Sequence, residues 1–260
     1  MARRKIEGSR AIVTGASSGI GREIALELAR HGARLILTAR RQDRLKELVD
    51  QVRPLGGQAQ FVVGDITDAD IRRAVVEAAQ SFYGGLDVLV NNAGIGAVGE
   101  FRTATPDRLR RVMEVNFFAP AELIRQALPL LQLGKRPIVV NVSSVLGHRA
   151  VPGKSEYCAS KFALHGLSDA LRAELAAVGI DVLLVSPSTT ESEFFDALIA
   201  TPAPSSPRRR AMPARLVAKR TLRAIRRGRH EIILTPSGTL LVWLDRLAPA
   251  LAERLVARFG

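Results

Sequence analysis

The chain has 260 residues, of which 47% are hydrophobic and 24% charged, values typical of a soluble globular protein long enough to bury a large core. It contains a single cysteine, Cys158, which excludes an internal disulfide and favours a reducing, cytoplasmic compartment. With 38 basic and 25 acidic residues, its formal net charge is +13.

The sequence contains no recognisable signal for export or membrane insertion. The N-terminus, "MARRKIEGSR", is basic, but only the short apolar run "AIV" follows it. A secretory signal needs about 7–15 apolar residues at that point. A membrane-spanning helix needs about 20, and no segment approaches that length. We therefore expect a cytoplasmic protein without a spanning helix.

Short apolar runs alternate with longer amphipathic segments along the chain. Seven runs rich in Val, Ile and Leu are predicted to be buried strands: "RAIVTG", "ARLILTAR", "AQFVVGD", "LDVLVNNAG", "PIVVNVSS", "GIDVLLVSP" and "HEIILTP". The predicted helices are Gly19–His31, Asp43–Arg53, Asp68–Tyr83, Pro106–Leu131, Ser155–Val178 and Arg215–Arg227. Strands without polar alternation are covered on both faces. The pattern therefore predicts an α/β fold, a doubly wound (Rossmann) parallel sheet of about seven strands with helices on both faces.

The first strand is followed by a glycine-rich turn. The run "AIVTGASSGIGREIA" places Gly15, Gly19 and Gly21 with the spacing G-x-x-x-G-x-G. Glycines allow the backbone to turn tightly and approach a pyrophosphate, and the helix that begins near Gly19 offers free N–H groups to the anion. Because the turn follows a strand and opens a helix, it predicts a dinucleotide-binding site.

The end of the second strand indicates which dinucleotide is bound. A fold that selects NAD usually has an acidic residue there, which accepts hydrogen bonds from the adenosine ribose. Here "LILTARRQD" has Thr38, Ala39, Arg40 and Arg41 instead. Guanidinium groups match a 2′-phosphate, so NADP(H) is favoured over NAD(H). Arg40 is the preferred candidate, because Arg41 could simply begin the next helix.

Four motifs occur in order: "TGASSGIG" (Thr14–Gly21), "NNAG" (Asn91–Gly94), "SSVLG" (Ser143–Gly147) and "YCASK" (Tyr157–Lys161). With them the chain resembles the short-chain dehydrogenase/reductase (SDR) family over nearly its whole length. The resemblance implies a catalytic tetrad of Asn116, Ser144, Tyr157 and Lys161; the family's serine lies thirteen residues before the tyrosine, which selects Ser144 over Ser143. With Arg40, the cofactor contacts expected are Thr14, Gly15, Ser17, Ser18, Gly19, Ile20, Gly21, Asp65, Ile66, Asn92, Ala93, Gly94, Tyr157, Lys161, Pro187, Thr190 and Ser192. No metal is expected.

The tetrad has a clear chemical basis. A phenol with a pKa near 10 is a poor base at neutral pH. We expect the Lys161 ammonium and the positive nicotinamide ring to lower the pKa of Tyr157 toward the working pH. Tyr157 would then exchange a proton with the substrate oxygen, to which Ser144 donates a hydrogen bond. Asn116 would hold a water that returns the proton through Lys161, and the cofactor supplies the hydride.

Some residues depart from the family pattern or lie beside its motifs. In "SPSTTES", Ser188 stands where the family commonly has glycine, and Ser192 stands at its threonine position. The missing glycine raises the question of backbone strain near the nicotinamide. His148 could border the substrate, whereas Cys158 and His165 are expected to be packing residues.

Two segments interrupt the strand–helix alternation. "TPAPSSPRRRAMP" (Thr201–Pro213) contains four prolines and is expected to be a mobile loop within a substrate flap at about residues 188–213. Residues 1–238 would form one catalytic domain. Residues 239–260 read as an amphipathic helical tail broken at Pro249. The tail's partner could be the domain's own core, another subunit or a membrane surface, so peripheral membrane contact stays open.

The basic residues are unevenly spread. No acidic residue occurs between Ala197 and His230, and ten arginines and lysines lie between Arg208 and Arg229. Such a patch could face nucleic acid, anionic lipid or a phosphorylated substrate, or could simply be solvated. Aromatic residues are few and are not interleaved with the basic ones, so we expect no nucleic-acid partner.

These observations lead to a functional hypothesis. The sequence predicts an NADP(H)-dependent oxidoreductase that interconverts a ketone and a secondary alcohol and, like its family, forms a homodimer or homotetramer. The leucine- and phenylalanine-bearing segment Glu191–Ile199 favours an apolar substrate, and the arginine cluster raises the alternative of an acyl-carrier or CoA thioester. A non-catalytic nucleotide-binding or scaffold protein of the same fold is the other alternative.

Overall fold

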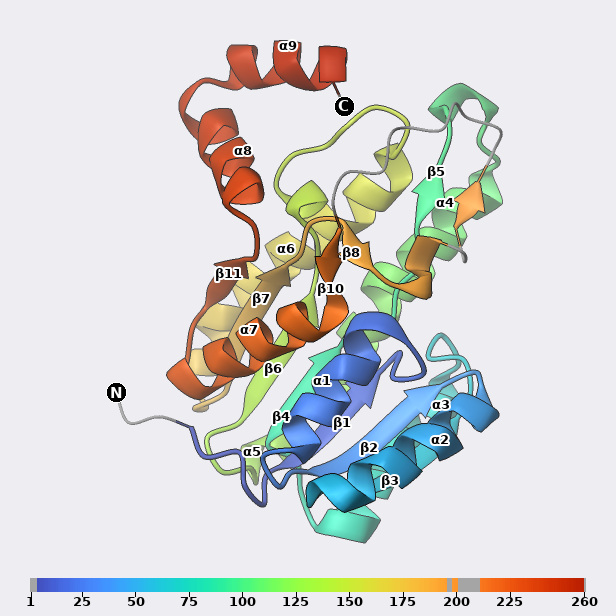
Figure 1. Ribbon diagram of the computed structural model, residues 1–260, viewed down its shortest axis with the longest axis vertical. Helices are drawn as coiled ribbons and strands as arrows, with labels where there is room; N and C mark the ends of the chain where they lie inside the picture. The colour runs from blue at the N-terminus through green and yellow to red at the C-terminus, as the bar shows by residue number, and fades with distance from the viewer. Residues whose placement is uncertain (1–3, 196–197, 201–210, 260) are drawn as a thin grey trace.

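A computed structural model describes residues 4–195, 198–200 and 211–259 (Figure 1). Its centre is a parallel sheet with the strand order β11-β7-β6-β4-β1-β2-β3. The strands are β1 (Arg10–Thr14), β2 (Arg34–Ala39), β3 (Gln58–Val63), β4 (Val88–Asn91), β6 (Ile138–Val142), β7 (Asp181–Ser186) and β11 (Glu231–Ile233). All seven strands predicted from the sequence are therefore confirmed.

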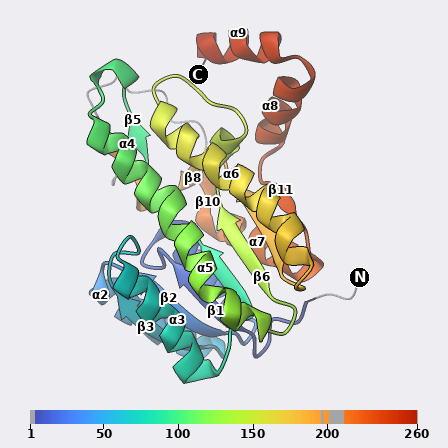
Figure 2. The ribbon, with the colours of Figure 1, turned by 180° about the vertical axis from the view of Figure 1, so that it is seen from behind.

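Helices cover both faces of this sheet, as predicted. One face carries α1 (Gly19–Ala29), α2 (Gln42–Val52) and α7 (Ala214–Arg227) (Figure 1). The other face carries α3 (Ala69–Tyr83), α5 (Ala119–Gln132) and α6 (Ser155–Ala176) (Figure 2). Neighbouring residues of β1 point to opposite faces of the sheet. Val13 packs in the core of the first face and Ile12 in that of the second, and both are fully buried.

The order of the strands fixes the position of the binding crevice. From β1 the chain adds β2 and β3 on one side, and from β4 it adds β6, β7 and β11 on the other. The order therefore reverses between β1 and β4, which are hydrogen-bonded neighbours. In open α/β sheets, ligands bind at the carboxyl ends of the strands on either side of such a reversal.

The long helix predicted over 106–131 is divided. It consists of α4 (Pro106–Met113), a π-helical turn (Glu114–Phe118) and α5. Pro120 has no N–H to donate to the carbonyl of Asn116, four residues earlier, which accounts for the loss of the regular α-helical pattern there. The interruption therefore falls on the residue assigned to the tetrad.

The last part of the chain forms two helices, α8 (Pro236–Leu247) and α9 (Pro249–Phe259), so the predicted break at Pro249 is confirmed. The Thr235 side chain caps α8, which begins at Pro236 rather than at 239. Both helices extend away from the central sheet (Figure 1). No helix in the described ranges is long and apolar enough to cross a membrane.

The predicted flap, residues 188–213, is described only in part, because 196–197 and 201–210 lie outside the described residues. Two short parallel pairs involve it. The pair of β8 (Thr190–Glu191) with β10 (Met212–Pro213) joins the two ends of the flap to each other. The pair of β5 (Ala97–Val98) with β9 (Ile199–Ala200) joins the flap to the body of the molecule. Arg208–Arg210 fall in the undescribed part, whereas the remaining basic residues of the cluster lie on α7 or just after it.

Candidate active site

The glycine-rich turn after β1 and the "NNAG" segment after β4 are bonded to each other. The Thr14 hydroxyl oxygen accepts hydrogen bonds from the backbone N–H groups of Asn92 (2.9 Å) and Ala93 (3.0 Å). The Asn92 side chain returns a bond from Nδ2 to the Thr14 carbonyl at 3.0 Å. These bonds fix the two loops side by side at the reversal of strand order.

The glycines of the turn leave no room for a side chain. Gly15 has a φ of 64°, and a Cβ there would lie 2.9 Å from the Cα of Ala93. A Cβ at Gly21 would lie 2.3 Å from Asn92 Nδ2 and 2.5 Å from the Gly15 carbonyl oxygen. The turn is thus a cradle of exposed backbone that opens helix α1, and it fits the pyrophosphate of a dinucleotide.

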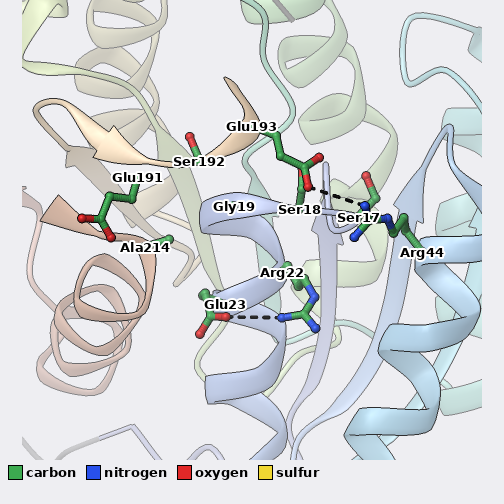
Figure 3. Close-up of a pocket in the computed structure, with 10 residues that line it drawn as sticks. All are labelled: Ser17, Ser18, Gly19, Arg22, Glu23, Arg44, Glu191, Ser192, Glu193 and Ala214. Carbon is green, nitrogen blue, oxygen red and sulfur yellow. Dashed lines mark hydrogen bonds and ion pairs between the residues drawn. The ribbon is translucent and has the colours of Figure 1, made fainter. Parts of the chain in front are cut away.

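The flap lies over one end of this turn. A Cβ at Gly19, whose φ is 55°, would lie 2.8 Å from the Cβ of Ser192. Glu191, Ser192 and Glu193 line a hollow of about 330 Å³ together with the turn and the first residues of α1 and α7 (Figure 3). Ser192, which was predicted to contact the cofactor, is therefore at the phosphate-binding turn.

An arginine lies against the glycine-rich turn, and it is Arg41. Its Nε and Nη2 donate hydrogen bonds to the Ser17 hydroxyl at 3.3 and 3.1 Å, and Nη1 contacts the Glu193 carboxylate at 2.6 Å. Arg44 lies 3.9 Å from the same carboxylate. Arg40, favoured from the sequence, is exposed at the same edge and has no hydrogen bond or ion pair with the described residues.

Asp65 and Ile66 follow β3 at the same edge of the sheet. The Asp65 carboxylate accepts hydrogen bonds from Thr67 and contacts Arg111 at 2.7 Å. Partial burial opposes ionisation of Asp65, but the bonds from Thr67 and Arg111 outweigh it and hold its pKa below the ordinary range. Ile66 is buried and accepts a bond from Arg72 through its carbonyl. The predicted adenine contacts of both residues stay predictions.

Three members of the proposed tetrad lie together beside the crevice. Ser144 follows β6, and its side chain hydrogen-bonds Tyr157, which lies in the first turn of α6. Lys161 lies one turn further along α6, with its Nζ 5.8 Å from the centre of the Tyr157 ring. That ammonium group donates to the Val142 carbonyl at 3.0 Å and is buried.

Burial dominates the protonation of this pair. It raises the pKa of Tyr157 to about 12, although the hydrogen bond with Ser144 opposes the shift. Burial also lowers the pKa of Lys161 to about 8. The expected lowering of the phenol's pKa is therefore absent from the protein alone, and the low-dielectric surroundings are the reason. Only an added positive charge, such as a bound nicotinamide, could reverse the direction.

Asn116 holds the loop after β4 in place. Its Oδ1 accepts from the Ile95 N–H, and its Nδ2 donates to the Ile95 carbonyl and to the Ser160 hydroxyl, all at 2.9 Å. A Cβ at Gly94 would lie 3.2 Å from Asn116 Oδ1 and 3.7 Å from Lys161 Nζ. The side-chain amide of Asn116 therefore holds the loop after β4 against α6. Its backbone carbonyl accepts no α-helical hydrogen bond, because Pro120 has no N–H.

The described part of the flap covers Tyr157 with apolar side chains. The Phe194 ring packs edge-to-face on the Tyr157 ring at 5.8 Å between centroids. A Cβ at Gly96 would lie 2.3 Å from a Leu198 methyl group and 2.9 Å from the Phe194 ring. The flap thus places Phe194 against the phenol and Leu198 against Gly96, in the loop after β4.

The serine that replaces a glycine causes no backbone strain. Arg136 is the only non-glycine residue with a positive φ in the described ranges, so Ser188 adopts an ordinary conformation. Its carbonyl accepts a hydrogen bond from the Thr190 hydroxyl at 3.0 Å, and the Pro187 carbonyl accepts one from the Val145 N–H. The substitution therefore leaves this loop intact.

Three residues beside the motifs point away from the reacting groups. Cys158 is buried, as expected for a packing residue. The His148 side chain contacts Ser186 and Glu231 instead of bordering the Tyr157 hydroxyl. His165 packs on His148 and hydrogen-bonds the Gly147 carbonyl, so it is more than ordinary helix packing.

Sequence reasoning missed the contacts that cross between distant segments. Glu193 lies 152 residues from its partner Arg41, and nothing in the sequence pairs them. The bond from Asn116 to Ser160 also joins two elements through side chains alone. Ser160 lies between Tyr157 and Lys161 in "YCASK", which is the one signal that could have drawn attention to it.

Comparisons with known proteins agree with this geometry. The family model for short chain dehydrogenases matches residues 9–202. Dehydrogenase/reductase SDR family member 7B of Bos taurus is 35% identical over 264 residues, covering 95% of this chain and 79% of the relative. A short chain dehydrogenase of Pseudocercospora fijiensis is 38% identical over 73% of this chain, a match that spans only 62% of the relative's own length.

Solved structures give the same result. The crystal structure of a short chain dehydrogenase/reductase from Burkholderia phymatum, in complex with NAD, superposes with a TM-score of 0.87 at 27% identity, covering 95% of this chain and 96% of that one. The chain belongs to the short-chain dehydrogenase/reductase family. It is accordingly an oxidoreductase of the class that acts on CH–OH groups with a nicotinamide dinucleotide.

Proposed function

We propose that the protein interconverts a ketone and a secondary alcohol with NADP(H), using Tyr157 as the proton donor and acceptor. The observation that carries this proposal is the juxtaposition of Ser144, Tyr157 and Lys161 beside the glycine-lined crevice. When bound, the dinucleotide supplies or accepts the hydride. The residues of the chain then have only to bind, orient and exchange a proton.

In the reducing direction, Tyr157 gives its proton to the carbonyl oxygen of the substrate. A pKa of about 12 keeps the phenol protonated in the free protein, which suits a proton donor. The Ser144 side chain hydrogen-bonds the Tyr157 hydroxyl, so a substrate oxygen placed between these two groups would receive a hydrogen bond from each. In the oxidising direction, the positive charges of a bound nicotinamide and of Lys161 would favour the phenolate.

Lys161 and Asn116 are assigned to proton return. A pKa of about 8 allows Lys161 to release and regain a proton near neutral pH. Pro120 leaves the Asn116 carbonyl without its α-helical donor, and that oxygen is the group we assign to a water next to Lys161. The Asn116 amide has a separate task, because its bonds hold Ile95 and Ser160.

The preference for NADP(H) rests on the arginines after β2. Arg41 bridges Ser17 of the glycine-rich turn and Glu193, and Arg40 and Arg44 lie at the same edge. No carboxylate occupies positions 38–41, where NAD-selective folds have one. The NAD bound by the Burkholderia phymatum protein is the contrary precedent, which makes a direct test necessary.

The test compares Arg41→Ala with Arg40→Ala in steady-state assays with both reduced cofactors. Charge-assisted hydrogen bonds contribute about 1.5–3 kcal/mol, so Arg41→Ala should lower kcat/KM for NADPH by roughly 10- to 150-fold. The value for NADH should change by no more than a few fold. An equal loss with both cofactors would show that Arg41 supports the turn and does not select the phosphate.

The substrate is proposed to be apolar, because Phe194 packs on Tyr157 and Leu198 packs beside it on the loop at Gly96. A panel of ketones, secondary alcohols and thioesters, scored by the absorbance of the reduced nicotinamide, tests both the reaction and the substrate class. Turnover of apolar ketones with NADPH is expected. Turnover of thioesters alone would favour the acyl-carrier alternative, and turnover of none would contradict the proposal.

We also propose that the apolar side of α8 and α9 is covered when the protein is at work. Five large apolar side chains of these helices are exposed: Leu240, Trp243, Leu247, Leu251 and Leu255. A second copy of the chain would make the protein an oligomer, whereas an anionic membrane surface would suit the net charge of +13 and a peripheral place in the cytoplasm.

The variant Leu247→Glu separates these two coverings. A smaller sedimenting species would assign the surface to a second copy. Loss of flotation with anionic vesicles would assign it to a membrane. An unchanged result in both measurements would contradict any covering of this surface.

A further inference from the structure

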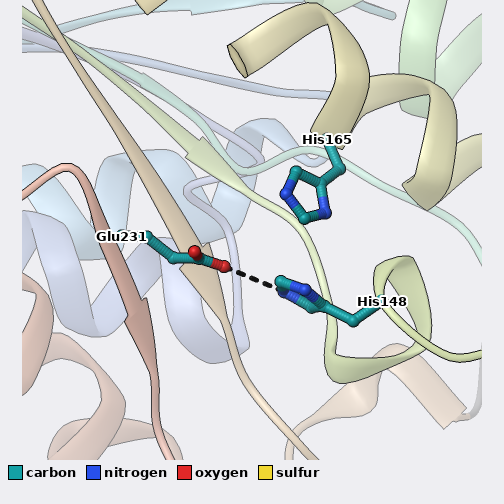
Figure 4. Close-up of side chains that lie close together, drawn as sticks. All are labelled: His148, His165 and Glu231. Atoms are coloured by element: carbon teal, nitrogen blue, oxygen red, sulfur yellow. Dashed lines mark ion pairs between the residues drawn. The ribbon is translucent and has the colours of Figure 1, made fainter. Parts of the chain in front are cut away.

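Two histidines and a glutamate meet behind the catalytic loop. His148 follows the short helix Val145–Gly147, His165 lies on α6 and Glu231 lies on β11, so three separate elements converge (Figure 4). One ring nitrogen of each histidine and one carboxylate oxygen all lie within 4.8 Å of one another. Nothing in the proposed reaction uses these three residues.

The contacts within this cluster are close. His148 Nε2 lies 3.1 Å from Glu231 Oε1 and 2.9 Å from the Ser186 hydroxyl oxygen. The two imidazole rings meet edge-to-face, with 4.4 Å between centroids. Only 3% of the His148 side chain is exposed. Such burial is costly for polar groups that lack partners.

Two buried atoms of the cluster lack a hydrogen-bond partner among the described residues: His148 Nδ1 and Glu231 Oε1. The contact between Glu231 Oε1 and His148 Nε2 has the distance of a hydrogen bond but not its direction. A carboxylate oxygen and an imidazole nitrogen without hydrogen-bond partners, close to a second imidazole, are what a cation requires.

We propose that His148, His165 and Glu231 bind a divalent transition-metal ion, with Zn²⁺ as the best match. Two imidazoles and one carboxylate are a common donor set for zinc. Zinc binds these donors at about 2.0–2.2 Å, which places them roughly 3.5 Å apart, so the cluster must contract by about 1 Å. Side-chain rotations of that size are modest for Glu231, which is partly exposed.

The surroundings of His165 support this assignment. Its Nδ1 lies 3.2 Å from the Gly147 carbonyl oxygen, an arrangement that keeps the proton on Nδ1 and the lone pair on Nε2. Metal-binding histidines usually donate their second N–H to such a carbonyl. Asp169 Oδ2 lies 3.3 Å from the same Nε2, and its other carboxylate oxygen accepts a hydrogen bond from Arg172.

A route for the ion is also present. A hollow of about 280 Å³ is lined by both histidines and by Asp169. It would admit the ion together with a water, which would complete a tetrahedral shell. Because zinc ligands are neutral imidazoles and a carboxylate, the site needs no cysteine.

The ion would have a structural role and not a catalytic one. His148 lies four residues after Ser144, and His165 lies on the helix that carries Tyr157 and Lys161. A bond between them would fix the position of the Ser144 loop against α6. Metal occupancy should therefore raise the thermal stability of the protein, by mass action on the folded state.

The experiment titrates the metal-free full-length protein with Zn²⁺ by calorimetry and with Co²⁺ by visible absorption. One ion per chain is expected, with the intense bands of four-coordinate Co²⁺. His148→Asn and Glu231→Gln should each weaken binding by more than about tenfold. The matched controls are His31→Asn and His230→Asn, which alter the other two histidines of the chain and should bind like the original protein.

Thermal unfolding with and without Zn²⁺ shows whether each variant is folded and whether the ion stabilises it. Zn²⁺ should raise the melting temperature of the original protein and of both controls, and leave His148→Asn and Glu231→Gln unchanged. Equal binding and equal stabilisation in all five proteins would overturn the assignment, as would a complete lack of binding by the original protein. In that case the three residues form a metal-free polar cluster.

Discussion

Replacing the buried lysine of the tetrad should stabilise the protein while it removes activity. Lys161 is buried, and Lys161→Met keeps the length of the side chain but removes its charge. Burial lowers the pKa of Lys161 from 10.5 to about 8. That fall corresponds to roughly 3 kcal/mol of unfavourable free energy for the charged form at neutral pH.

The variant also loses one hydrogen bond, from Nζ to the Val142 carbonyl at 3.0 Å. Leaving that carbonyl without a donor costs about 1 kcal/mol. The net expectation is a gain of roughly 2 kcal/mol at pH 7. For a chain of this length the entropy of unfolding is about 0.5 kcal/mol/K, so the melting temperature should rise by about 4 °C.

The advantage of Lys161→Met should depend on pH. Below pH 8 the lysine is charged in both the folded and the unfolded protein, and the full penalty applies. Between about pH 8 and 10.5 the folded protein has already released the proton that the unfolded chain still holds. The stability of the original protein therefore rises with pH in this window. The advantage of the variant should fall through zero and become, above pH 10.5, a deficit of about 1 kcal/mol from the lost hydrogen bond.

Thermal unfolding followed by circular dichroism, from pH 7 to 10.5, measures this difference. Lys46→Met is the matched control, because Lys46 is an exposed lysine on α2, and it should shift stability by less than about 0.5 kcal/mol. The reasoning is refuted if Lys161→Met is less stable than the original protein at pH 7. It is equally refuted if the difference stays constant across the pH range.

Two further predictions concern charged side chains. Glu156→Gln breaks a buried ion pair in which Arg108 lies 2.6 and 3.0 Å from the carboxylate, and removing the negative partner of this buried pair should cost roughly 3–5 kcal/mol in thermal unfolding. Glu100→Gln, at an exposed ion pair, should cost under about 1 kcal/mol, and equal losses would contradict the argument. Glu193→Gln removes the exposed ion pair that holds Arg41, which contributes about 0.2–1 kcal/mol. Arg41 is then available to the cofactor, so fluorescence titration should find NADPH bound roughly 1.4- to 5-fold more tightly. Weaker binding of NADPH would count against Arg41 as a phosphate ligand.

The fold could be predicted from the sequence because each strand carries its own signal. Runs such as "IVVNV", which is β6, are almost wholly apolar and are buried on both faces, which requires two layers of helices. The glycine-rich turn was equally readable, since Gly15 and Gly21 fill places where the structure has no room for a Cβ. Local residue chemistry sufficed in both cases.

The features of the site that could not be predicted depend on contacts between segments distant in the sequence. Arg41 and Glu193 meet only because the flap folds back over the turn after β1. The direction of the pKa shift of Tyr157 was also beyond the sequence. A neighbouring Lys161 suggested a lower pKa, but the depth of burial decides the direction and raises it to about 12. Spacing along a helix reports which side chains are neighbours, and it does not report how much water surrounds them.

The proposed catalysis depends most on the proton of Tyr157. Single-turnover reduction of an accepted ketone by NADPH, followed by nicotinamide absorbance in Tyr157→Phe, tests it most directly. General acid catalysis contributes about 10²–10⁴-fold, so hydride transfer should slow by at least about 100-fold while NADPH affinity changes by no more than a few fold. Hydride transfer at the original rate in this variant would contradict the proposed mechanism.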